Sequence, residues 1–118
     1  MNELPIIQVT FDFQKKLLLR VLKFPRNLRH GLGSRIESLL SFIFENLLRA
    51  KFSPHGEKVG FLEAVNVDLE LLRFQLRLAI DLQALPKDAA EHLFSQLFEI
   101  GSQVGGWLKS LLRKQDAA

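Results

Sequence analysis

Apolar residues recur at helical spacing along nearly the whole chain, and the segment Val59–Leu82 shows this pattern best. Its apolar positions alternate between spacings of three and four, which places them in a line along one face of a helix. They are Leu62, Val65, Leu69, Leu72, Leu76 and Ala79. Further apolar residues widen this line, namely Leu71, Phe74, Leu78 and Ile80. We therefore expect a helix that is buried on more than one side.

Two arginines, Arg73 and Arg77, lie within this apolar segment. They are four residues apart and so share one face of the helix. A guanidinium group cannot stay dry without a partner. Two interpretations remain open: acidic residues of neighbouring helices pair with these arginines, or the arginines line a groove that meets a polyanion or a partner.

The same helical spacing occurs in three other segments, which are separated by short breaks. Thr10 is a candidate N-cap for the first helix, which is expected to end before Pro25. Segments of alternating residues bounded by hairpin turns do not occur. The pattern predicts one domain over residues 1–118, an all-α, antiparallel, up-down four-helix bundle. Its helices are expected at about residues 10–24, 26–51, 58–83 and 87–114.

Small residues in two helices raise the question of close packing. Gly31 and Gly33 either let another helix or subunit approach or are simply tolerated. Gly101 and Gly105 lie on one side of the fourth helix near Trp107. Such glycines allow close approach of two helices, and tryptophan often anchors interfaces. These three residues are candidates for an oligomer interface, and the alternative is that Trp107 fills the core of its own subunit.

The formal net charge is +3, but it is unevenly distributed. Residues 1–51 hold nine basic and four acidic residues, whereas residues 52–118 hold seven and nine. No acidic residue interrupts the interval between Asp12 and Glu37. This interval favours an anionic partner, nucleic acid first, although a solvated basic helix face remains the alternative. Its candidate binding residues are Lys15, Lys16, Arg20, Lys23, Arg26 and Arg29.

Residue types that carry catalysis are poorly arranged in this sequence. No glutamate is followed by histidine three residues later, the spacing that di-metal bundles use. The histidines, His30, His55 and His92, lie in separate segments, and cysteine is absent. We therefore expect no enzyme activity, no metal and no cofactor. No apolar run is long enough to span a membrane and no export signal is evident, so we expect a cytoplasmic protein.

Three segments carry a resemblance to a known family. They are KFPRNLRHGLGSRIE at Lys23–Glu37, LLRFQLRLAIDLQAL at Leu71–Leu85, and EIGSQVGGWLKSL at Glu99–Leu111. In this order and spacing the chain resembles the accessory variability determinant (Avd) proteins of diversity-generating retroelements. The wider group includes four-helix bundles encoded in intervening sequences of bacterial large-subunit ribosomal RNA genes.

The resemblance implies a barrel-shaped homopentamer. It also implies association with the reverse transcriptase of the same element and with nucleic acid, chiefly template RNA but also DNA, in support of mutagenic retrohoming. Arg73 and Arg77 match a basic pair of the family that is implicated in such contacts. The alternative is a structural or interaction bundle of the ribosomal intervening-sequence type, without a retroelement role.

Overall fold

The computed structural model describes residues 4–117, and every regular element in that range is helical. The four long helices are α1 (Leu4–Val21), α3 (Ser34–Phe52), α4 (Lys58–Asp81) and α5 (Lys87–Ala117). Short elements join them: α2 (Arg26–Leu28), the π-helical turn η1 (Arg29–Gly33) and the 3₁₀ turn η2 (His55–Glu57). The predicted all-α bundle is confirmed.

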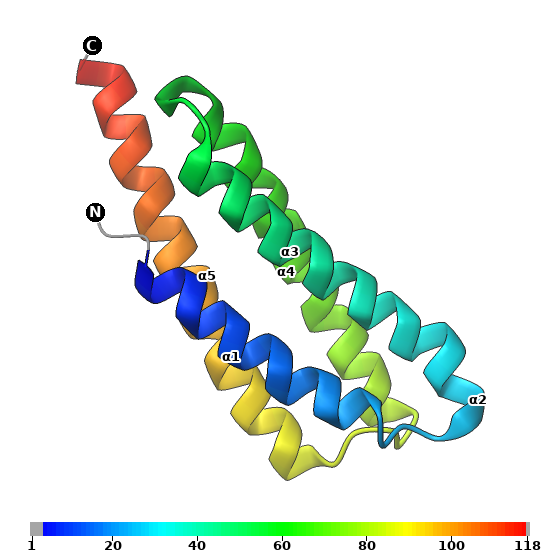
Figure 1. The fold of residues 1–118 in the computed structure, drawn as a ribbon. Helices are drawn as coiled ribbons and strands as arrows, with labels where there is room; N and C mark the ends of the chain where they lie inside the picture. Colours follow the sequence, from blue (N-terminus) through cyan, green and yellow to red (C-terminus); the bar gives the residue numbers. More distant parts are fainter. Residues whose placement is uncertain (1–3, 118) are drawn as a thin grey trace.

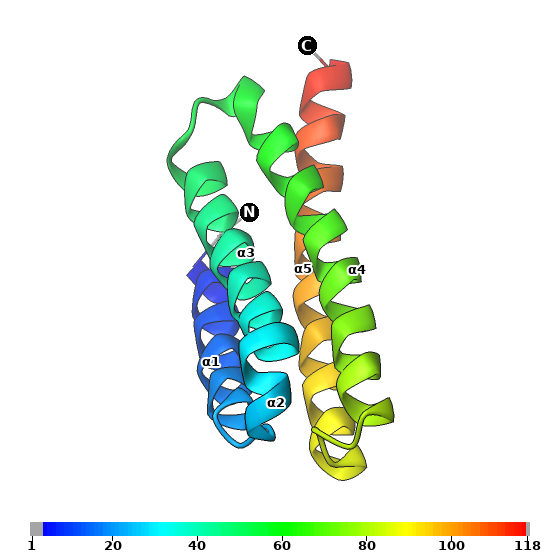
Figure 2. The same ribbon diagram turned by 90° about the vertical axis from the view of Figure 1, so that its right-hand side faces the viewer.

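The long helices alternate in direction along a bundle that measures 52 × 23 × 20 Å (Figures 1 and 2). Helix α1 packs beside α3 and α5, and α4 likewise packs beside α3 and α5. The helices α1 and α4 therefore occupy diagonally opposite corners. This placement decides which surfaces can meet within one subunit.

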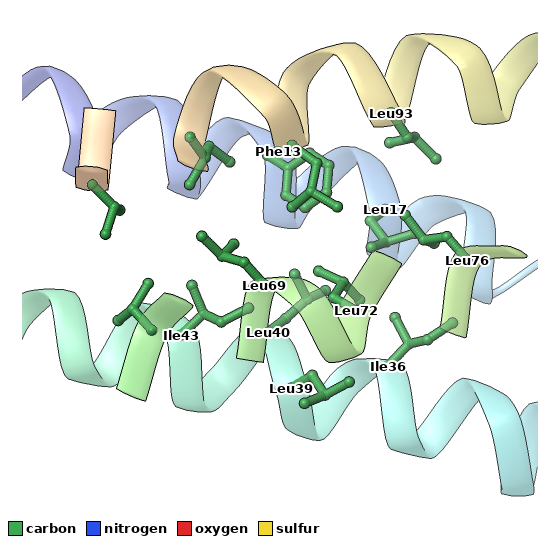
Figure 3. Close-up of a cluster of buried hydrophobic side chains, with 14 of the residues drawn as sticks. Phe13, Leu17, Ile36, Leu39, Leu40, Ile43, Leu69, Leu72, Leu76 and Leu93 are labelled. Atoms are coloured by element: carbon green, nitrogen blue, oxygen red, sulfur yellow. The ribbon is translucent and has the colours of Figure 1, made fainter. Parts of the chain in front are cut away.

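The core is almost entirely aliphatic and draws on all four long helices (Figure 3). The cluster includes Phe13 and Leu17 of α1, Ile36 of α3, and Leu72 and Leu76 of α4. Each of these side chains is at most 1 % exposed. Burial of this kind contributes about 1.5–3 kcal/mol per large side chain before entropy is counted.

Helix α1 begins six residues before the predicted position. The predicted N-cap, Thr10, is wrong, because Thr10 lies inside α1 and is 1 % exposed. Ile6, Thr10, Phe13 and Leu17 form one buried line, so the apolar face continues toward the N-terminus. Pro5 is compatible with this start, since proline is tolerated in the first turn of a helix.

The predicted second helix is divided by the π turn η1. The backbone N–H of Ser34 donates to the carbonyl oxygen of Arg29, which inserts one extra residue into the turn. Gly33 is buried here, and a Cβ atom added to it would lie 3.1 Å from Cγ1 of Val21. Gly33 therefore allows close approach of α1 within the same subunit, whereas a Cβ atom on Gly31 would meet no atom within 4 Å.

Helix α4 packs on two neighbours, but the predicted widening of its buried line is wrong for three of the four residues named, since Ile80 is partly buried against the core and the others are exposed. The three-four line is buried in α4, but Leu71, Phe74 and Leu78 are between 44 % and 55 % exposed. The reason is that α4 occupies a corner of the bundle, where neighbours cover only part of its surface. Arg73 and Arg77 consequently lie at the edge of the core rather than inside it.

Candidate nucleic-acid and partner interface

Three of the six predicted basic residues of the N-terminal interval come together in one cleft. Lys16, Arg20 and Lys23 follow one side of α1 and its C-terminal turn at spacings of four and three. They line an open cleft of about 530 Å³ between α1 and the first turns of α5. His92 and Asp88 of α5 line the same cleft. We call these five residues the α1–α5 cleft.

The charges of the α1–α5 cleft are mostly unpaired. The salt bridges found in the described part of the chain join Arg49 with Glu45 and Arg73 with Glu70. Asp88 therefore faces three cations without forming an ion pair with any of them. The cleft keeps an excess of positive charge that is open to solvent, which is the arrangement that binds phosphate groups.

Lys15 lies on a different side of α1, although it precedes Lys16 directly. It lines a shallow apolar depression together with Phe11, Leu18 and Leu22. Adjacent residues on a helix point about 100° apart, so Lys15 and Lys16 line different depressions. The structure therefore separates Lys15 from the α1–α5 cleft.

Arg26 and Arg29 lie at the corner that joins the first two long helices. Arg26 is exposed in α2, whereas Arg29 is half-buried in η1. The Nε atom of Arg29 is buried and has no hydrogen-bond partner within residues 4–117. The side-chain stem of Arg29 packs beside Gly33, with Cγ 3.6 Å from the position of an added Cβ atom. Arg29 thus contributes to packing of the π turn as well as to surface charge.

Arg73 and Arg77 share one side of α4 but have different surroundings. Nη1 of Arg73 donates to Oε2 of Glu70 at 2.7 Å, and the Arg73 side chain is 32 % exposed. Arg77 is exposed and lies over the ring of Phe74, with Cζ 5.4 Å from the ring centroid. Arg73 is therefore paired within its own helix, whereas Arg77 forms no salt bridge within residues 4–117.

Of the three candidate interface residues of α5, Trp107 and Gly101 pack within their own subunit, whereas Gly105 faces open space. Trp107 is 4 % exposed and belongs to the core of its own subunit, so it cannot anchor a contact from this position. Gly101 lies against α4, since a Cβ atom added to it would lie 3.6 Å from Nη2 of Arg73. Gly105 is half-buried, and an added Cβ atom would meet nothing within 4 Å.

We expect Gly105→Ala to raise the free energy of unfolding by about 0.5–1 kcal/mol, because alanine is the better helix former and the site has room. Urea denaturation measures this change. Gly33→Ala is the control, and it is expected not to stabilise because Val21 is in the way. If the Gly105→Ala variant keeps its fold but has a smaller molecular mass in solution than the wild type, its oligomer has dissociated. That result would place Gly105 at a contact between copies.

Asp68 is an acidic residue whose carboxyl group is partly shielded from solvent. It lines a groove between α3 and α4 with Arg35 and Leu71, and burial raises the pKa of its carboxyl group above the ordinary value. No salt bridge involving Asp68 is present in residues 4–117.

Sequence reasoning missed the part that α5 plays in the basic cleft. Asp88 and His92 are far from Lys16 in the sequence, and only the packing of α1 on α5 brings them together. No local pattern could have revealed this. Within residues 4–117 no group of three potential metal ligands occurs. Nor does any helix in that range combine the length and apolar character that crossing a membrane requires.

The comparisons with known proteins agree with the resemblance found in the sequence. No curated protein matches the chain. A family model described as bAvd-like matches residues 5–111, a range that contains the α1–α5 cleft and both arginines of α4. Since this match covers most of the 118 residues, the chain belongs to the bAvd-like family.

Proposed function

We propose that the protein is a non-enzymatic, cytoplasmic accessory protein of a diversity-generating retroelement. In this role it assembles as a homopentamer and binds the reverse transcriptase of the element and its template RNA, in support of mutagenic retrohoming. Membership of the bAvd-like family supports the accessory role. The single observation that carries RNA binding is the α1–α5 cleft, with its three unpaired cations.

The charge of one cleft is modest, which is why assembly matters to the proposal. Electrostatic affinity for nucleic acid rises with the number of phosphates that are neutralised. A closed ring repeats each cleft once per subunit and so multiplies the basic surface. The ring thereby converts three weakly binding cations per subunit into a surface that can hold an RNA strand.

Arg77 and Arg73 complete the proposed partner surface on α4. Arg77 carries a free guanidinium group at the protein surface, so it is the stronger candidate for the reverse transcriptase or for RNA. Arg73 is already paired with Glu70, and a partner would have to compete with that exposed carboxylate. Such exposed pairs contribute little, about 0.2–1 kcal/mol, so competition is feasible.

RNA binding is tested with the triple variant Lys16→Ala/Arg20→Ala/Lys23→Ala. We expect weaker binding to single-stranded RNA, with the slope of log affinity against log salt reduced by about 2 for each cleft engaged, because each lost phosphate contact removes about 0.7. Fluorescence anisotropy across a salt series measures both quantities. Arg73→Ala/Arg77→Ala is measured beside it, with co-purification of the reverse transcriptase as a second readout.

The matched control removes three exposed cations from the other end of the bundle, Lys109→Ala/Arg113→Ala/Lys114→Ala. It lowers the net charge equally but leaves the α1–α5 cleft intact. If the two triple variants lose affinity equally, binding depends on net charge alone and the cleft is not the RNA site. A ribosomal intervening-sequence bundle would fail to retain any reverse transcriptase.

A further inference from the structure

The α1–α5 cleft contains apolar side chains that a phosphate group does not need. Leu19 lies on α1 between Lys16 and Lys23, at spacings of three and four, and it is 54 % exposed. Ala89 and Leu93 of α5 also line the cleft. Both helices therefore place hydrocarbon between the charged groups. Apolar walls with a few polar groups around them are typical of sites that hold a flat organic ligand.

His92 adds an aromatic ring to the α5 side of the cleft. It is exposed and lies one helical turn after Asp88. Histidine is among the side chains on which unpaired bases stack in proteins that bind RNA. Of the three histidines in residues 4–117, His92 is the one that lines this cleft, whereas His30 and His55 belong to the turns η1 and η2.

The charges of the cleft are divided between its two sides. All three cations come from α1, and the carboxylate of Asp88 comes from α5. A phosphate group is attracted to the α1 side and repelled by Asp88. The edge of a nucleobase carries amino groups, and carboxylates accept hydrogen bonds from such groups. An RNA strand is therefore favoured with its phosphates along α1 and its bases turned toward α5.

A double helix cannot use the apolar walls of the cleft. In an RNA duplex the bases are paired and stacked on one another, so a protein meets mainly phosphates and 2′-hydroxyl groups. The volume of the cleft, about 530 Å³, lies in the range of pockets for small molecules. It has room for an unpaired base that is turned out of its strand, but not for a duplex.

We propose that the α1–α5 cleft binds unpaired nucleotides in preference to duplex RNA. The phosphates lie along the three cations of α1, and one base packs between Leu19 and His92, with its polar edge toward Asp88. The inference rests on the proposed function and names the form of RNA that this site takes. It adds two base-contacting residues to a site that otherwise holds only the sugar-phosphate backbone.

The first test compares a short, unstructured RNA strand with the same strand annealed to its complement. Fluorescence anisotropy across a salt series gives the affinity for each form. At high salt the single strand is expected to bind about tenfold more tightly than the duplex, because base stacking persists when phosphate attraction is screened. Equal or tighter binding of the duplex at high salt would overturn the inference.

The second test changes the ring of His92. His92→Ala is expected to lower the affinity for the single strand about tenfold, while the slope of log affinity against log salt and the affinity for the duplex stay unchanged. His92→Phe keeps an aromatic ring without a charge, so it is expected to bind the strand at least as tightly as the wild type. If both variants lose affinity and lower the slope, His92 acts through charge, which would contradict stacking.

Leu19→Ser removes the opposite wall and is expected to weaken single-strand binding in the same way. Leu19 also borders the apolar depression around Leu22, so light scattering verifies that this variant keeps the wild-type mass. If the mass changes, the His92 variants decide the question, because His92 is not part of that depression. The matched controls, His30→Ala and His55→Ala, remove exposed histidines outside the cleft. Losses in these controls equal to that of His92→Ala would exclude a specific base contact.

The same measurements separate this inference from the proposed function. A wild-type chain that binds both RNA forms equally, and loses affinity in Lys16→Ala/Arg20→Ala/Lys23→Ala but not in His92→Ala, would overturn the base contact and leave RNA binding through the cleft standing. A wild-type chain that binds neither form would overturn the RNA-binding proposal itself. The His92 and Leu19 variants keep all three cations of α1, so a loss of affinity in them is not caused by a loss of those charges.

Discussion

Leu97→Ala is expected to lower the free energy of unfolding by about 3 kcal/mol, the largest effect that we predict for a single substitution. Leu97 is 0 % exposed in the middle of α5, where it packs in the common core of the bundle. Truncation removes the burial of three carbon atoms and leaves a cavity that rigid helices on several sides cannot close. Urea denaturation followed by circular dichroism measures the change.

The matched control is the next residue along the helix. Phe98 is larger than Leu97 but 72 % exposed, so Phe98→Ala is expected to change the free energy of unfolding by at most about 0.5 kcal/mol. The pair separates burial from residue size within one turn of one helix. Equal losses for the two variants would mean that α5 is rotated about its axis relative to the structure.

Lys58→Met is expected to lower the free energy of unfolding by about 2 kcal/mol. Nζ of Lys58, in the first turn of α4, donates to the carbonyl oxygens of Ala50 and Lys51 at 2.6 and 3.0 Å. These carbonyl oxygens belong to the last turn of α3, where they have no backbone N–H donor from their own helix. Charged hydrogen bonds of this kind contribute about 1.5–3 kcal/mol when partly buried. Thermal and urea denaturation of the variant measure the loss.

Methionine keeps an apolar stem similar to that of lysine, so Lys58→Met removes the ammonium group with little loss of packing. Lys109→Met is the control, because Lys109 is exposed on α5 and makes no hydrogen bond or salt bridge that the structure records. If the two variants are equally stable, the hydrogen bonds from Lys58 to the end of α3 do not stabilise the α3–α4 pair. The effect should be local, since α1 and α5 do not contribute to this cap.

Charged and apolar surfaces lie on different sides of the bundle. The cations of the α1–α5 cleft form no salt bridge within residues 4–117, whereas exposed apolar residues such as Phe74 and Leu78 follow the outer side of α4. The proposed RNA site and the exposed apolar residues of α4 therefore lie on different sides of the molecule.

The helical class and the core follow from the sequence because both depend on local spacing. The line from Leu62 to Ala79 specified the buried side of α4, and the prolines at 25, 54 and 86 lie where helices are interrupted. Membership of the family was likewise visible in the segments that contain Arg73 and Trp107. Spacing alone, however, could not distinguish a residue that extends the core from one that extends an exposed ridge.

Tertiary structure decided that distinction and also sorted the charges. Leu71 and Leu72 are adjacent leucines, yet Leu72 is 0 % exposed and Leu71 is 44 % exposed, because α4 sits at a corner with neighbours on two sides only. Lys15 and Lys16 are adjacent lysines, yet one lies in an apolar face and the other in a basic cleft completed by α5. The sequence by itself determined which residues are apolar, which are charged and how they repeat along a helix. Which of them face another helix and which face solvent depends on how the four helices pack around a shared axis, since residues far apart in the chain supply the neighbours.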